Sequence, residues 1–203
     1  ILSRPLSIQS TRQRKLKELA DTHSWQFKSE PVNQTHDFQR FYFFKSRPVE
    51  EKYNRISAPG SAWEIFDLTF EEGAFLAFEE YHTTLGMVTF PYPIPKFTIE
   101  KKVFPDRILN LADHKDIDYA LYRDFSDDFI VKVENVEAMH AFLNDDLKRL
   151  IETSEVIHHL ESDGEAVLLF TDNLRLAHMR DYLNIVAFAE ALKKYAGQSV
   201  SDS

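Results

Sequence analysis

Two pairs of β-type runs, each joined by a short turn, constrain the fold of this chain most. The first pair is Trp63–Phe70 and Phe75–Thr83, joined by a Glu-Glu-Gly turn. The second is Val156–Glu161 and Ala166–Thr171, which flank a Ser-Asp-Gly turn. Two strands joined by a short glycine-containing turn pair antiparallel as a hairpin. The pattern therefore predicts an antiparallel sheet and disfavours the alternating βαβ order of a doubly wound nucleotide fold.

Three segments carry apolar residues at helical spacing. The first starts near Ser10 or Thr11 and ends near His23; the others are Val136–Ile151, after the capping residue Asn135, and Met179–Tyr195. Strands gathered before and between a few helices are typical of the α+β class. We expect an α+β fold, a mainly antiparallel sheet covered by about three helices.

The chain of 203 residues is long enough to bury a large core without disulfides. No long polar linker or internal repeat divides it, so we expect a single domain over residues 11–196. Residues 1–10 are expected to be an extended lead-in because Pro5 discourages a helix, and residues 197–203 a disordered tail.

Three segments leave alternatives open. Phe38–Phe44 is too aromatic to be exposed and is either a buried strand or a helical segment. Arg47–Tyr53 has the composition of a loop or short helix. In Pro91–Pro95, every second residue is proline, which removes backbone donors and excludes a central strand. This segment either docks a partner or routes the chain toward Phe97.

Charge is distributed unevenly along the chain. The net charge is −9, yet the first 20 residues hold five basic side chains and one acidic, so the rest carries about −13. An acidic body argues against nucleic-acid binding, which needs a basic face. The basic N-terminal part suits a membrane surface or an acidic partner, or is a solvated helix start.

The chain contains no apolar run of the roughly 20 residues that a membrane-spanning helix needs. It begins with Ile rather than Met, which leaves open that an upstream targeting or membrane segment has been removed.

Four residues are candidate metal ligands: Asp113, His114, Asp116 and His159. Carboxylates and imidazoles bind zinc, manganese or iron, which would allow metal-assisted hydrolysis. However, no HExxH pattern occurs, and His159 and its neighbour His158 would point to opposite faces of a strand. We therefore favour an acidic, solvated loop over residues 113–118 and expect no cofactor.

Other catalytic patterns are missing. The chain has no cysteine, no G-x-S-x-G serine-hydrolase pattern, and neither of the glycine-rich phosphate-binding patterns. No catalytic residue is assigned.

The order of elements resembles the soluble domain of an uncharacterised bacterial family that is usually tethered to a membrane by upstream helices. The similarity spans residues 11 to 195. It is carried by packing and turn residues: Trp25-x-Phe27, Trp63–Phe70, Pro95-x-Phe97, Asp116–Asp118 to Phe125, Phe129–Val133, and the hairpin at Gly164. The resemblance implies a fold and a bacterial, membrane-associated context, but no reaction.

These observations favour a non-catalytic binding or interaction module at the cytoplasmic face of a membrane, with a protein as its partner. Edge strands leave a homodimer open. A metal-assisted hydrolase remains one alternative, and a carrier of an apolar ligand remains another. The carrier would need an enclosed, aromatic-lined cavity of several hundred Å³.

Overall fold

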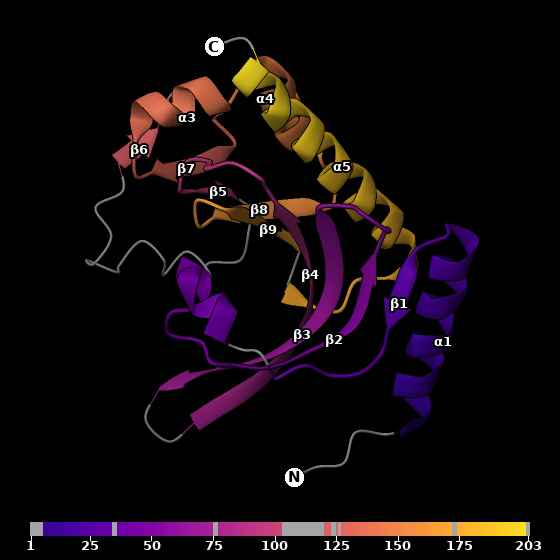
Figure 1. Ribbon diagram of the computed structural model, residues 1–203. Coiled ribbons are helices and arrows are strands. Elements are labelled where there is room, and N and C mark those ends of the chain that lie inside the picture. Colours follow the sequence, from indigo (N-terminus) through magenta and orange to yellow (C-terminus); the bar gives the residue numbers. More distant parts are fainter. Residues whose placement is uncertain are drawn as a thin grey trace.

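The computed structural model describes residues 6–33, 36–74, 77–102, 120–122, 125, 127–171 and 174–201. Within these residues nine strands form one sheet in the order β1-β2-β3-β4-β9-β8-β5-β7-β6 (Figure 1). Each pair of neighbouring strands runs antiparallel. The predicted α+β class with an antiparallel sheet is confirmed, and both predicted strand pairs are antiparallel neighbours. The turn predicted at Glu71-Glu72-Gly73 was wrong, because these residues belong to β3 and pair with β4.

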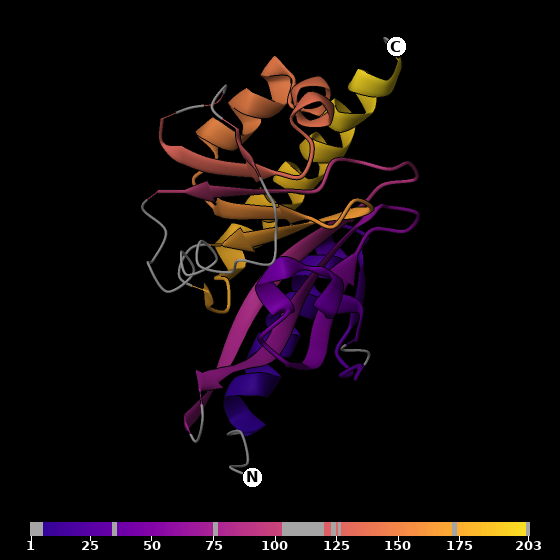
Figure 2. The ribbon, with the colours of Figure 1, turned by 90° about the vertical axis from the view of Figure 1, so that its left-hand side faces the viewer.

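The strands are β1 (Gln26–Lys28), β2 (Val49–Ser57), β3 (Trp63–Ala74), β4 (Ala77–Thr89), β5 (Phe97–Lys101), β6 (Ala120–Tyr122), β7 (Phe129–Val133), β8 (Ile157–Ser162) and β9 (Ala166–Thr171). The sheet is strongly twisted, as expected for strands of L-residues. In Figure 2, β2–β4 run steeply down the picture, while the strands of the second half run across it.

The described residues contain four α-helices rather than about three: α1 (Leu6–Thr22), α3 (Val136–Phe142), α4 (Asp145–Thr153) and α5 (Met179–Ser201). The additional helix arises because the helix predicted over residues 136–151 is interrupted at Asn144. The Asn144 side chain accepts a hydrogen bond from the backbone N–H of Leu147 at 2.9 Å and so caps a new helix.

Both terminal helices extend beyond their predicted limits. Helix α1 begins at Leu6, directly after Pro5, where the extended lead-in was expected to continue to residue 10. Proline is tolerated at the start of a helix, so a proline in the sequence does not prevent a helix from following it. Helix α5 continues to Ser201, through Gly197, because a glycine weakens a helix by only about 1 kcal/mol. None of the helices in the described ranges combines the length and apolar character needed to cross a membrane.

The prediction of a loop or short helix over Arg47–Tyr53 was wrong, because Val49–Ser57 is strand β2. Its register against β3 shifts twice, between Val49 and Glu51 and between Tyr53 and Ile56. Bulges break the strict alternation of apolar and polar residues by which a strand is recognised in a sequence.

The two faces of the sheet bury two separate hydrophobic cores. The larger one packs α5, α3 and α4 against Ile65, Val88 and Leu169. The smaller one places the 3₁₀ turns η1 (His36–Arg40) and η2 (Tyr42–Phe44) against the opposite face. The aromatic segment over residues 38–44 therefore takes the helical alternative.

Candidate functional site

The predicted metal ligands do not form a site in the described part of the chain. Asp113, His114 and Asp116 lie outside the described residues, whereas His159 lies in β8 with its side chain fully buried. Its ring contacts the Phe170 ring edge-on, with 4.8 Å between centroids. Among the described residues no group of three His, Cys, Asp or Glu side chains could hold a metal ion.

Glu161, an acidic neighbour of His159, has a structural role. Its Oε2 lies 3.9 Å from His159 Nε2 and accepts a hydrogen bond from the Phe43 backbone N–H at 3.1 Å. Its Oε1 accepts from the Tyr42 N–H. The buried carboxylate thus accepts from two successive backbone donors of η2. This pair of bonds attaches the aromatic segment to the sheet.

Glu100 of β5 lies opposite His159 in the sheet and is 6% exposed. Its Oε1 has no hydrogen-bond partner among the described residues. Burial raises the pKa of Glu100, and the nearby charges of His159 and Lys132 oppose that rise. An acid in this setting favours its neutral form more than an exposed glutamate does.

An open groove of about 850 Å³ is bordered by the proline segment. Its other borders are α3, the turn between β8 and β9, and the end of α5. The apolar lining residues are Tyr92, Pro93, Ile94, Pro95, Ala138, Ala141, Phe142 and Ala196; the polar and charged ones are Arg40, Lys96, Glu134, Asn135, Asp163 and Glu165, with Gly164 at the turn. Most of the exposed lining is apolar, and small side chains on α3 keep the groove open. We refer to this site as the proline groove.

The wall formed by residues 92–96 is held by hydrogen bonds on both sides. The Ile94 N–H donates to the Gly164 carbonyl at 2.9 Å, and the Ser162 hydroxyl donates to the Pro95 carbonyl at 2.6 Å. On the other side, the Glu134 N–H donates to the Lys96 carbonyl at 3.1 Å. Because proline also fixes its own backbone angle, this wall is stiff before any ligand arrives.

The backbone angle at residue 164, rather than a lack of space, requires glycine. Its φ is 103°, a region that other residues rarely adopt, whereas a Cβ at this position would lie at an ordinary contact distance of 3.4 Å from Lys96 Cγ.

Ion pairs border the proline groove. Arg40 Nε lies 2.7 Å from Asp163 Oδ2, and Arg40 Nη1 lies 3.3 Å from Glu165 Oε2. Lys96 Nζ lies 3.6 Å from Glu134 Oε1. The Tyr92 phenol adds a neutral polar group, and partial burial raises its pKa. An apolar floor with a charged rim is the general form of a binding surface.

The described residues that line the groove include no serine, threonine, cysteine or histidine. Its acidic side chains lie in ion pairs with Arg40 or Lys96.

A buried ion pair, missed by the sequence reasoning, joins α1 to the sheet. Arg12 Nε and Nη2 lie 2.7 and 2.8 Å from the two oxygens of Asp67, whose side chain is fully buried. Asp67 also accepts hydrogen bonds from Asn54 Nδ2 at 2.9 Å, Thr84 Oγ1 at 2.6 Å and Tyr182 OH at 3.2 Å. Burial and the negative charge of Asp67 raise the pKa of Tyr182 well above its usual value.

A signal for this pair was present in the sequence. Asp67 stands between Phe66 and Leu68, in a strand with large apolar residues on both faces. Such a strand is covered on both sides, so a carboxylate within it must have a buried partner. The partner, Arg12, lies 55 residues away and is not evident from the pattern.

A second groove, of about 830 Å³, lies beside this ion pair. It is lined by the N-terminal half of α1 and the residues that lead into α5: Thr11, Arg12, Lys15, Leu176, Ala177, His178, Met179 and Arg180. We refer to it as the basic groove.

Comparison with known proteins gives a fold and no family. No protein-family model matches the chain, and no curated protein matches it. Among solved structures, it is similar to the mycobacterial trehalose monomycolate transport factor A, TtfA, with a TM-score of 0.65 and 10% sequence identity. The match covers 90% of this chain and 93% of TtfA. At this identity the likeness establishes a shared fold alone.

Proposed function

We propose that this protein is a non-catalytic binding module that holds an extended, apolar segment of a protein partner in the proline groove. The observation that carries the proposal is the groove itself, which is open and mostly apolar and has a stiff proline wall and ion pairs along its rim. A stiff wall lowers the ordering cost of binding, because only the ligand loses freedom.

The openness of the groove favours a protein segment over a carried small molecule. A carrier must enclose most of its ligand, whereas the proline groove opens to solvent along its length. The apolar floor suits one or two large side chains of the partner, and the rim charges suit its polar flanks. The resemblance in fold to a transport factor supports a role without catalysis, by analogy only.

We further propose that the module works at the cytoplasmic face of a membrane. Five of the first 20 residues are basic, while the chain as a whole is acidic, and such an asymmetry favours the anionic surface of a membrane.

Site-specific photo-cross-linking in the cells that produce the protein tests the groove. A photoreactive residue replaces the exposed Pro93 of the wall. We expect a cross-linked adduct of one defined mass, and we expect Ala141→Arg, which fills the groove from α3, to abolish it. The matched control is Ala187→Arg, the same change at an exposed alanine of α5 outside the lining.

The proposal is overturned by the absence of any adduct, or by an adduct that survives Ala141→Arg. It is also overturned if Ala187→Arg removes the adduct equally, since the effect would then not depend on the groove.

A further inference from the structure

The basic groove concentrates positive charge in an acidic protein. Residues 11–22 and 174–181, which surround it, hold six basic and three acidic side chains, whereas the chain as a whole has 24 Lys and Arg against 33 Asp and Glu. None of the residues that line the groove is acidic. The local excess of positive charge is therefore opposite in sign to that of the whole molecule.

Two side chains of the groove are available to an external anion. Lys15 is exposed and makes no ion pair with a described residue. The Arg180 side chain is 82% exposed, and its Nε lies 3.4 Å from Asp181 Oδ1, which leaves the outer part of the guanidinium facing solvent. Arg12 differs, because Asp67 already neutralises its charge.

The acidic residues of α1 are directed to other partners. Asp21 Oδ2 pairs with Lys17 Nζ at 2.8 Å, and Glu18 Oε1 lies 3.9 Å from Arg14 Nε. Both lie toward the far end of the helix, beyond the groove lining. They reduce the net positive charge of α1 without entering the groove.

Apolar side chains complete the lining. Leu176 and Met179 are half-buried and lie between the basic residues. Basic residues that flank an apolar strip match the headgroup region of a bilayer, where phosphates border the first methylene groups of the acyl chains. A soluble anion would leave this apolar strip in water.

We infer that the basic groove is the surface by which the protein lies on a bilayer that contains anionic phospholipid, with Lys15 and Arg180 against the lipid phosphates. The inference deepens the membrane part of the proposed function and rests on it. The occupant is the membrane surface rather than a free phosphate compound.

Contact between the basic groove and a membrane would also orient the proline groove. The basic groove lies at the start of α5 and the proline groove near its end, at Ala196. With a rise of 1.5 Å per residue, the 17 steps from Met179 to Ala196 span about 25 Å. Figure 1 shows α1 near the start of α5, and α3 and α4 beside its opposite end. A protein lying on its basic groove would therefore present the proline groove about 25 Å further along the axis of α5.

Vesicle flotation with the full chain tests this inference. One set of vesicles contains phosphatidylcholine alone, and the other an equal mixture of phosphatidylcholine and phosphatidylglycerol. We expect binding to the mixed vesicles only. The double variant Lys15→Gln/Arg180→Gln should then bind about 25-fold more weakly, because each basic residue near an anionic surface contributes about fivefold. The matched control, Lys193→Gln/Lys194→Gln, removes the same charge from exposed residues at the other end of α5 and should bind as the unmodified chain does.

Three results overturn the inference: equal binding to both kinds of vesicle, an equal loss in both double variants, or full competition by glycerol phosphate at millimolar concentration. The last result would identify a soluble phosphate compound as the ligand. None of these results changes the cross-link at Pro93, so failure of this inference is distinguishable from failure of the partner-binding proposal.

Discussion

The buried pair of Arg12 and Asp67 allows a sharp test of what holds α1 on the sheet. Replacing Arg12 with methionine keeps an apolar side chain but removes the guanidinium group that donates to both carboxylate oxygens of Asp67. Breaking a buried ion pair by removing one partner costs about 3–5 kcal/mol, because the other charge remains without compensation. Here the Arg12 side chain is 16% exposed, and Asp67 keeps three neutral donors. We therefore expect a loss near the lower limit, about 3 kcal/mol of unfolding free energy.

For a chain of this length, each kcal/mol shifts the melting midpoint by about 2–4 °C, so Arg12→Met should lower it by about 6–12 °C. Asp67→Asn alone should cost a similar amount. The loss of unfolding free energy in the double variant should be at least about 2 kcal/mol smaller than the sum of the two single losses. The reason is that the second change removes a charge that the first had left unpaired. Urea unfolding followed by circular dichroism measures all three values.

The matched control is Arg14→Met on the same helix. Arg14 and its partner Glu18 are both about 70% exposed, and such a pair contributes at most about 0.5 kcal/mol. If Arg12→Met proves as mild as Arg14→Met, or if the two changes at Arg12 and Asp67 add to within about 0.5 kcal/mol, the ion pair does not hold α1 and the reasoning is refuted.

Three further changes probe the sheet. Gly86→Ala should lower the unfolding free energy by about 1–3 kcal/mol in urea titrations, because a Cβ there would lie 3.0 Å from Leu169 Cδ1 and 3.2 Å from Ile185 Cγ2. An unchanged urea midpoint would mean that α5 moves to accommodate the added methyl group at little cost. Glu161→Gln should cost about 1–3 kcal/mol, since a neutral amide cannot accept from two backbone donors of η2 through two oxygens, and intact protection of those two amides in hydrogen exchange would contradict this. The pKa of Glu100 is raised in the folded state, so the folded protein binds the Glu100 proton more tightly than the unfolded chain does. The stability that this proton contributes is fully present below the ordinary glutamate pKa of 4.5. It is lost as pH rises through the raised pKa of the folded state. Glu100→Gln should therefore stabilise the protein at neutral pH and weaken that pH dependence in thermal melts, whereas a destabilised variant with an unchanged pH profile would refute the assignment.

The hairpins show what local pattern can decide. The turn between β8 and β9 needs a residue with positive φ, and Gly164 supplies it at 103°. Runs of β-branched and aromatic residues on either side then pair by the shortest route. The same local rule predicted that β3 and β4 pair but placed the turn too early, at Glu71-Glu72-Gly73, whereas the register runs from Trp63 opposite Val88 to Ala74 opposite Ala77.

Where the local sequence pattern gave the wrong secondary structure or left it open, contacts between residues distant in the sequence decide the structure. Strand β2 contains two register shifts, so its buried residues do not alternate, and only its neighbours β1 and β3 make it a strand. The aromatic segment at residues 38–44 forms 3₁₀ turns because Glu161, far along the chain, accepts their backbone donors.

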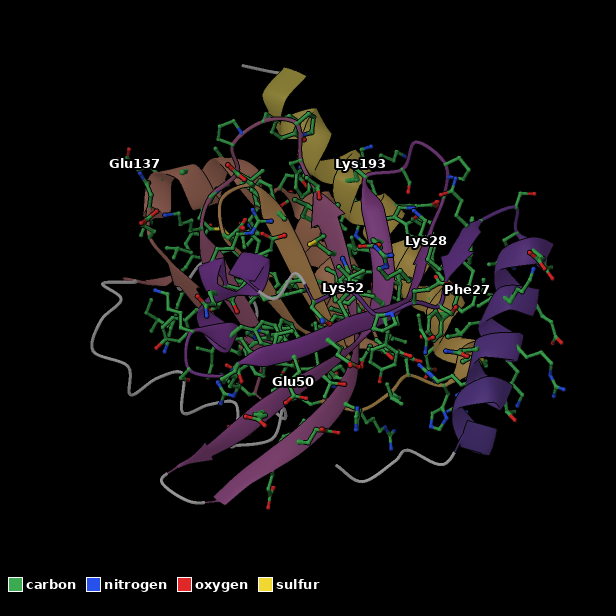
Figure 3. The ribbon with its side chains drawn as sticks, turned by 60° about the horizontal axis from the view of Figure 1, so that its bottom comes forward. Phe27, Lys28, Glu50, Lys52, Glu137 and Lys193 are labelled. Atoms are coloured by element: carbon green, nitrogen blue, oxygen red, sulfur yellow. The ribbon has the colours of Figure 1, made fainter. Side chains whose placement is uncertain are left out.

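Both proposed binding surfaces also come from distant segments. The alternating prolines of Pro91–Pro95 excluded a central strand, but only the fold places this segment beside Ala141 of α3 and the turn at Gly164. Figure 3 shows Glu137 on the outer side of α3 and Lys193 on α5. In the same way, Lys15 and Arg180 are 165 residues apart and share a groove only because α1 packs beside the start of α5.

The sequence by itself determined the class of the fold, the two hairpins, the start of the last helix and the missing catalytic patterns, because each depends on neighbours within a few residues. Only the tertiary structure decided the strand order, the partner of Asp67 and the composition of both grooves. These depend on which distant segments lie against each other, and that is set by how all the apolar faces are buried together.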